Sequence, residues 1–160
     1  MRLAHIPGLA TAALVASCQP SFELSNQQRG IQQSILEDQI DAWAQGLNNR
    51  HLDSVMAMYE ESEAIVVSWP NGVRSTGREA SDQALTDFYN AIQYMNFGPQ
   101  NVLVDVLNPG AAVATFRYSV DILRDDTRRD PFAGQGTIVW VRQSDRDDWK
   151  IRVQHLSRNH

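Results

Sequence analysis

The stretch AAVATFRYSVDILRDDTRRDPFAGQGTIVWVRQSDRDDWKIRVQHLS, residues 111–157, decides the fold of this chain. Three segments rich in β-branched and aromatic residues predict strands, at 111–123, 134–143 and 149–157. Charged and polar residues fill the two intervals, 124–130 and 144–148, and are typical of hairpin turns. We therefore expect the chain to end in three long antiparallel strands.

The residues before this stretch alternate helical and extended patterns. Apolar residues at helical spacing predict helices over 31–47, over 52–59, and from a capping box at Thr76–Glu79 to near Gly98. Short extended segments predict strands at 63–69, 73–75 and 101–107. This order predicts an α+β fold in which the helices pack on one face of an antiparallel sheet.

The N-terminus has the pattern of an export signal. Arg2 precedes the short apolar run Ile6–Val15, which is too short for a permanent membrane span. The run ends in Val15-Ala16-Ser17-Cys18, which resembles the lipobox of bacterial lipoproteins. Cys18 is the only cysteine of the chain, so lipidation explains it better than a free thiol does, and no intramolecular disulfide can form.

The chain divides into three expected parts: the lipobox resemblance implies the first, and the polar stretch without helical or strand periodicity at 19–30 predicts the second. They are a signal peptide ending at lipidated Cys18 (residues 1–18), a flexible tether (19–30) and a folded domain (31–157). The implied location is the bacterial cell envelope, with the protein lipid-anchored and facing the periplasm. A plain secretory signal and a disordered N-terminus are the alternatives.

Charge and motifs narrow the classes of function. The formal net charge is −5 and no dense Lys/Arg stripe is present, so we expect no nucleic-acid partner. The sequence shows no glycine loop for a phosphate, no metal-ligand spacing and no nucleophile motif. We therefore expect no cofactor and no bound metal.

The order of elements resembles the cone-shaped NTF2-like fold, which includes SnoaL-like and ketosteroid-isomerase-like proteins. The resemblance rests on Trp43 in the first helix, on Met58–Glu61 and on the segments Asn71–Val73, Gly77–Ala80 and Val139–Arg142. Residues 107–157 are also similar to the association domain of calmodulin-dependent kinase II.

This resemblance implies a curved sheet with three helices on its concave face, enclosing a ligand cavity. It also implies a homodimer through the outer sheet face, where we expect apolar residues such as Ile138 and Trp140. Ketosteroid-isomerase-like enzymes carry an acidic base in the first strand. That strand has no carboxylate here after Glu63, which argues against isomerase chemistry.

Alternation along two strands selects the residues that can face the cavity. Trp149, Ile151, Val153 and His155 share one face of the last strand, so we expect His155 to point inward, as a ligand contact, an acid–base group or a core histidine. In the strand 111–123, polarity places Phe116 and Tyr118 inward. The kinase-association resemblance instead implies that Arg117 is a pocket arginine able to bind a carboxylate. Both interpretations of Arg117 stay open.

Large aromatic residues complete the candidate ligand-binding set. Trp43, Tyr59, Trp69 and Phe88 can line the cavity or pack in the core. We predict an exported domain that binds a small organic ligand able to carry a carboxylate. The alternatives are a lyase, isomerase or cyclase that uses His155 and Tyr59 with Asp121, and a non-catalytic assembly module with a filled cavity.

Overall fold

The computed structural model describes residues 24–124 and 128–159, and the predicted signal peptide with Cys18 lies outside them. Its elements are α1 (Asn26–Asn48), α2 (Leu52–Met56), β1 (Val66–Ser68), β2 (Arg74–Thr76), α3 (Arg78–Asn90), β3 (Tyr94–Asn108), β4 (Ala111–Leu123), β5 (Arg129–Val141) and β6 (Lys150–Arg158). The strands form one sheet in the order β2-β1-β6-β5-β4-β3. β1 pairs in parallel with β6, and the other pairs are antiparallel.

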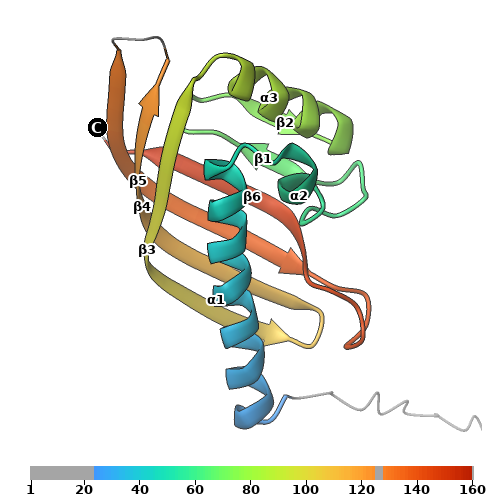
Figure 1. Ribbon diagram of the computed structural model, residues 1–160. Coiled ribbons are helices and arrows are strands. Elements are labelled where there is room, and N and C mark those ends of the chain that lie inside the picture. The colour runs from blue at the N-terminus through green and yellow to red at the C-terminus, as the bar shows by residue number, and fades with distance from the viewer. Residues whose placement is uncertain (1–23, 125–127, 160) are drawn as a thin grey trace, which may run out of the picture.

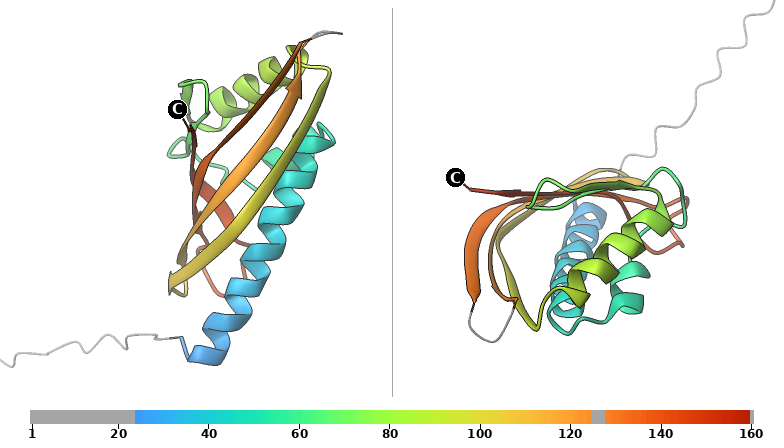
Figure 2. Two further views of the ribbon diagram at one scale, coloured as in Figure 1. Left: turned by 90° about the vertical axis from the view of Figure 1, so that its left-hand side faces the viewer. Right: turned by 90° about the horizontal axis from the view of Figure 1, so that it is seen from above.

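The sheet is curved, and all three helices lie on its concave face (Figure 1). Seen from above, the long strands curl around α1, while α3 covers one end of the sheet (Figure 2). The predicted α+β cone is therefore confirmed. None of the helices among the described residues has the length and apolarity needed to cross a membrane.

α1 closes the free edge of β3 with side-chain hydrogen bonds. The Asn48 amide donates to Phe97 O (2.9 Å) and accepts from Phe97 N (2.6 Å). Gln33 donates to Val104 O at 3.0 Å, and Arg29 donates to Val106 O. Unpaired backbone N–H and C=O groups of an edge strand can pair with a strand of another chain. The hydrogen bonds from α1 occupy several of these groups in β3 and also hold α1 over the sheet.

Two glycines of β5 make room for aromatic rings of β4 to lie over β5 on the concave face. A Cβ at Gly134 would lie 2.5 Å from Tyr118 Oη, and a Cβ at Gly136 would overlap the Phe116 ring. Because β5 carries no side chain at these two inward positions, Tyr118 reaches from β4 across β5 and donates to Ser157 O of β6 at 3.0 Å.

A β-bulge in β6 reverses part of the predicted alternation. Val139 pairs with Val153 but Trp140 pairs with Ile151, so Arg152 is the extra residue. Trp149 and Ile151 are buried as predicted, whereas beyond the bulge Gln154 and Leu156 face inward. His155 is exposed on the convex face, so the prediction that it points inward is wrong. The sequence has no marker for this register shift.

The faces of β4 and β5 settle two further predictions. Phe116 and Tyr118 are buried, and Arg117 is exposed on the convex face between Gln100 and Gln135. Polarity therefore predicted β4 correctly, and the pocket position for Arg117 is wrong. Ile138 and Trp140 are fully buried on the concave side rather than on the outer face, because they continue the inward alternation set by Gly136.

Several element boundaries differ from the prediction; β5, for example, begins at Arg129 instead of residue 134, because β4 pairs with it as far as Leu123. α1 begins at Asn26, inside the predicted tether, because Ser25 and Gln28 form a capping box. α3 is capped by Gly77 without a side-chain bond, since Thr76 belongs to β2. α3 ends at Asn90, and β3 begins at Tyr94 because β4 pairs along its whole length, up to Leu123 opposite Tyr94.

Candidate ligand cavity

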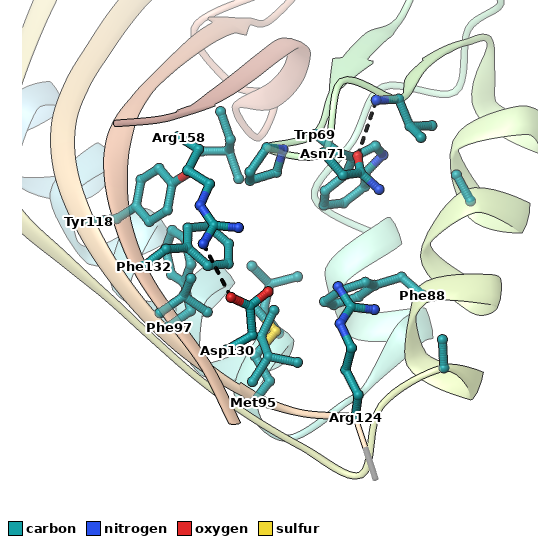
Figure 3. A pocket seen from close by; sticks show the side chains of 18 of the residues that line it. Trp69, Asn71, Phe88, Met95, Phe97, Tyr118, Arg124, Asp130, Phe132 and Arg158 are labelled. Carbon is teal, nitrogen blue, oxygen red and sulfur yellow. Dashed lines mark hydrogen bonds and ion pairs between the residues drawn. The ribbon is translucent and has the colours of Figure 1, made fainter. Parts of the chain in front are cut away.

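A cavity of about 410 Å³ lies between α3, the β1–β2 turn and the curved strands β3–β6 (Figure 3). This volume is within the range of small-molecule sites. The residues that line it are mainly apolar: Leu47, Trp69, Pro70, Val73, Ala84, Phe88, Ala91, Met95, Phe97, Tyr118, Val120, Ile122, Phe132 and Leu156, with Asn71, Asp87, Arg124, Asp130 and Arg158 as the polar members.

Aromatic rings form two walls of the cavity. On one side Trp69 and Phe88 stack, with ring centroids 6.4 Å apart and planes 17° from parallel. On the other side the Phe97 and Tyr118 rings stack at 5.0 Å, and Phe132 meets Tyr118 edge-on. Figure 3 shows the two groups on opposite sides of the space. A flat molecule can therefore contact ring faces or edges on both sides.

The polar lining residues gather at the rim. Asn71, Asp87, Arg124 and Arg158 are exposed and Asp130 is half-buried. The buried lining residues are apolar or aromatic: Leu47, Met95, Phe97, Tyr118, Val120, Ile122 and Leu156. Arg158 Nη2 donates to Asp130 Oδ1 at 3.1 Å, and the guanidinium carbon lies 4.3 Å from the Phe132 ring centroid. The side chain of Arg158 is thus held at the mouth by an ion pair and a cation–π contact.

Tyr118 is the polar group that lies deepest along this wall. Burial raises the pKa of its phenol to about 12, although nearby Arg158 acts in the opposite direction. The phenol is therefore neutral at physiological pH, and its proton is already donated to Ser157 O. Tyr118 supplies a ring surface to the cavity rather than a base.

A second polar cluster lies in the core, outside the lining of the cavity. Trp43 Nε1 donates to Tyr59 Oη at 3.3 Å, and Tyr59 Oη donates to Gln154 Oε1. All three residues are at most 2% exposed, and none of them lines the cavity. Burial raises the pKa of the Tyr59 phenol above its ordinary value, which keeps it protonated as a donor.

The structure separates the residues that the sequence grouped as a site. Trp69 and Phe88 line the cavity, whereas Trp43 and Tyr59 lie in the core, and Arg117 and His155 lie on the convex face. Asp121 also faces away from the cavity and pairs with Arg129 at 2.7 Å.

The catalytic set His155, Tyr59 and Asp121 therefore does not assemble. Within residues 24–124 and 128–159, no three His, Cys, Asp or Glu side chains gather as a possible metal site.

Sequence reasoning missed the rim residues Arg124, Asp130 and Arg158 and the buried Gln154. The first two stand at the ends of strands in a stretch that the sequence predicted as a solvated turn, and Arg158 follows the predicted domain end. The strands β4, β5 and β6 all bring one end to the same rim, which is a consequence of sheet register. The ion pair between Asp130 and Arg158 can be predicted only when the register of β5 and β6 is known.

Comparison with known proteins agrees with this architecture. Residues 36–159 match the SnoaL-like domain family. No curated protein matches the chain significantly.

Solved structures with similar folds share little sequence with the chain. A candidate aromatic ring hydroxylase from Novosphingobium aromaticivorans has a TM-score of 0.71 at 15% identity, covering 81% of this chain and 91% of that one. A candidate scytalone dehydratase from the same organism has a TM-score of 0.69 at 17% identity, covering 78% and 82%.

An NTF2-like superfamily protein from Salmonella enterica has a TM-score of 0.70 at 17% identity, covering 79% of this chain and 90% of that one. The TM-scores of these structures establish a shared fold, and identities this low establish nothing further. The match over residues 36–159 establishes the family. The chain belongs to the SnoaL-like domain family.

Proposed function

We propose that this SnoaL-like domain binds a small organic molecule, with a flat apolar body inside the cavity and an acidic group at its rim. The observation that carries the proposal is the distribution of polarity: aromatic walls enclose about 410 Å³, and the polar lining residues gather at the mouth. The names of two structural neighbours, a ring hydroxylase and a scytalone dehydratase, support an aromatic ligand.

The rim offers two guanidinium groups to the acidic group. Arg124 follows the end of β4 and Arg158 ends β6, and both side chains reach over the cavity (Figure 3). In the part of the chain that the structure describes, Arg158 has one ion-pair partner, Asp130, and no carboxylate lies within ion-pair distance of Arg124. A carboxylate bound there takes charge-assisted hydrogen bonds without being buried.

A matched pair of probes tests the acidic group. We expect 2-naphthoate to bind more tightly than its neutral isostere 2-naphthamide, by about fivefold at low ionic strength, because only the carboxylate gains charge-assisted bonds at the rim. Arg158→Gln and Arg124→Gln should each reduce this preference, and added salt should weaken it. Isothermal titration calorimetry gives the dissociation constants.

Arg117→Gln is the control, since it removes the same charge from the convex face. Equal affinity for the two probes, or the same change in all three variants, would contradict an acidic group at the rim. Failure of both probes to bind the wild type would count against the cavity as the binding site.

We also propose that the protein is exported and anchored through lipid-modified Cys18. The support is the lipobox-like Val15-Ala16-Ser17-Cys18 together with the absence of any other cysteine. α1 begins only eight residues after Cys18, and its N-terminal end lies opposite the end covered by α3 (Figure 1). An anchor there leaves the cavity mouth roughly 35 Å away along the 23-residue helix.

Replacing the cysteine tests the anchor. We expect Cys18→Ser to move the protein from the membrane fraction to the soluble periplasmic fraction, because the acyl chains provide the hold on the bilayer. Cell fractionation and intact-mass measurement give the readout, with Ser17→Ala as the control for a neighbouring change. A wild-type protein that is soluble and carries no acyl mass would refute the anchor.

The homodimer remains a proposal with a new set of residues. Val113, Val139 and Val153 are half-buried and stand in one row across β4, β5 and β6 on the convex face. Leu103 of β3, which is 71% exposed, lies opposite Thr115, two residues along β4 from Val113. An apolar patch of this kind favours self-association. Sedimentation velocity should show a dimer for the wild type and a monomer for Val139→Lys. The control Ile35→Lys changes an exposed residue of α1 and should leave the dimer intact. A single chain in the wild type would overturn the proposal.

A further inference from the structure

The bulge in β6 turns a glutamine into a core residue. Gln154 is fully buried, whereas regular alternation from Ile151 would have placed Val153 inside and Gln154 outside. Burying an amide in place of a valine costs free energy unless every polar atom is paired. Bulges that re-aim a side chain are over-represented next to functional sites, so this amide needs an explanation.

The orientation of the Gln154 amide is fixed by its neighbours. Tyr59 Oη accepts from Trp43 Nε1 and donates its own proton to Gln154 Oε1. Because the amide oxygen faces Tyr59, the Nε2 group points to the other side. Nε2 is buried and has no hydrogen-bond partner among the residues that the structure describes. A buried donor without an acceptor destabilises the folded protein.

Three residues that line the cavity, Leu47, Phe97 and Leu156, form its floor next to the cluster of Trp43, Tyr59 and Gln154. Leu156 lies two residues after Gln154 on the same face of β6, and Leu47 lies one turn after Trp43 on α1. The Phe97 ring meets the Trp43 ring edge-on, with centroids 5.4 Å apart. Leu47, Phe97 and Leu156 all line the cavity, so each joins a cavity wall to the buried cluster.

We propose that Gln154, oriented by Tyr59, forms an inner subsite that donates a hydrogen bond to a neutral carbonyl oxygen of the ligand once the Leu156 side chain turns aside. This inference rests on the proposed ligand-binding function and adds a second recognition point to it. The unpaired group is an amide N–H donor, so an oxygen acceptor fits. A carboxylate does not fit, because burying its charge without a cation is too costly.

Two probes of the same shape separate the carbonyl from the apolar body. 2-Acetylnaphthalene and 2-ethylnaphthalene differ in the carbonyl oxygen and carry no charge, so neither forms an ion pair with the rim arginines. We expect Gln154→Leu to lower the affinity for 2-acetylnaphthalene by about fivefold relative to the affinity for 2-ethylnaphthalene, which is the effect of losing one hydrogen bond. Gln135→Leu, an exposed position on β5, is the control and should affect both probes alike.

An infrared measurement tests the subsite without a variant. The C=O stretch of bound 2-acetylnaphthalene should lie at the lower frequency of a hydrogen-bonded ketone rather than at the frequency found in an alkane. Leu156→Ala should raise the affinity for 2-acetylnaphthalene more than the affinity for 2-ethylnaphthalene, because the smaller side chain leaves the Gln154 amide accessible from the cavity.

The outcomes separate the two proposals. If both probes bind and respond equally to Gln154→Leu, with an alkane-like C=O stretch, the subsite is overturned and the cavity stands. If neither probe binds the wild type, the proposed function falls and the subsite falls with it.

Discussion

Gly134→Ala is expected to destabilise the domain by about 3 kcal/mol and to lower its melting temperature by roughly 10 °C. The added Cβ would lie 2.5 Å from Tyr118 Oη and closer still to the carbonyl oxygen of Ser157. The Ser157 carbonyl oxygen cannot move away without disturbing the pairing of β5 with β6. The Tyr118 side chain cannot move away without losing its hydrogen bond to that oxygen. One methyl group thus strains three strands at once.

Thermal denaturation followed by circular dichroism measures this effect. Gly30→Ala is the matched control, because a Cβ at this position in α1 meets nothing within 4 Å. The control should be neutral or slightly stabilising, since alanine favours the helix by up to about 1 kcal/mol. A Gly134→Ala protein that melts together with the control would show that Tyr118 does not cross β5 as described.

The sequence predicted the sheet because its strands carry strong local signals. The span of β4 was predicted to the residue, and the alternation of Phe116 and Tyr118 with Arg117 correctly assigned its two faces. Here the simple polarity argument was better than the implied pocket arginine. A regular strand has one buried face, and its apolar residues select that face.

Register and boundaries could not be predicted because they depend on distant partners. The bulge at Arg152 follows from how β6 pairs with β5, and nothing in the local pattern marks it. Met95 was expected on a helix because Ile92 and Met95 repeat at helical spacing. Pairing of Tyr94 with Leu123 instead draws this segment into β3, so tertiary contacts overrode a short periodic signal.

The candidate site was predicted only in its apolar half. Trp69 and Phe88 line the cavity as one interpretation held. Trp43 of α1 and Tyr59, which follows α2 and pairs with Ile151, are core residues that bond to each other away from the cavity. The polar half was missed. Arg158 reaches the rim through sheet register, and Gln154 reaches the core through a bulge.

Ala84→Trp is expected to abolish ligand binding, with a loss of affinity of at least about 100-fold. Ala84 is a half-buried residue of α3 that lines the cavity one helical turn before Phe88. An indole ring at this position would occupy the space between the two aromatic walls, and a bound ligand would have to displace it. The protein itself should stay folded, because the ring fills an existing cavity instead of overpacking the core.

Ala42→Trp is the control, since it makes the same change at an exposed position of α1 that does not line the cavity. Circular dichroism should show native folding in both variants. A fall in affinity shared by the two variants would point to a general effect of the added indole.

Calorimetric titration of 2-naphthoate into the wild type, Ala84→Trp and Ala42→Trp tests the ligand-binding cavity most directly. The cavity proposal predicts one site per chain in the wild type and in Ala42→Trp, and no measurable binding to Ala84→Trp. Equal affinity in all three proteins would place binding elsewhere, and no binding to the wild type would contradict the proposed ligand class.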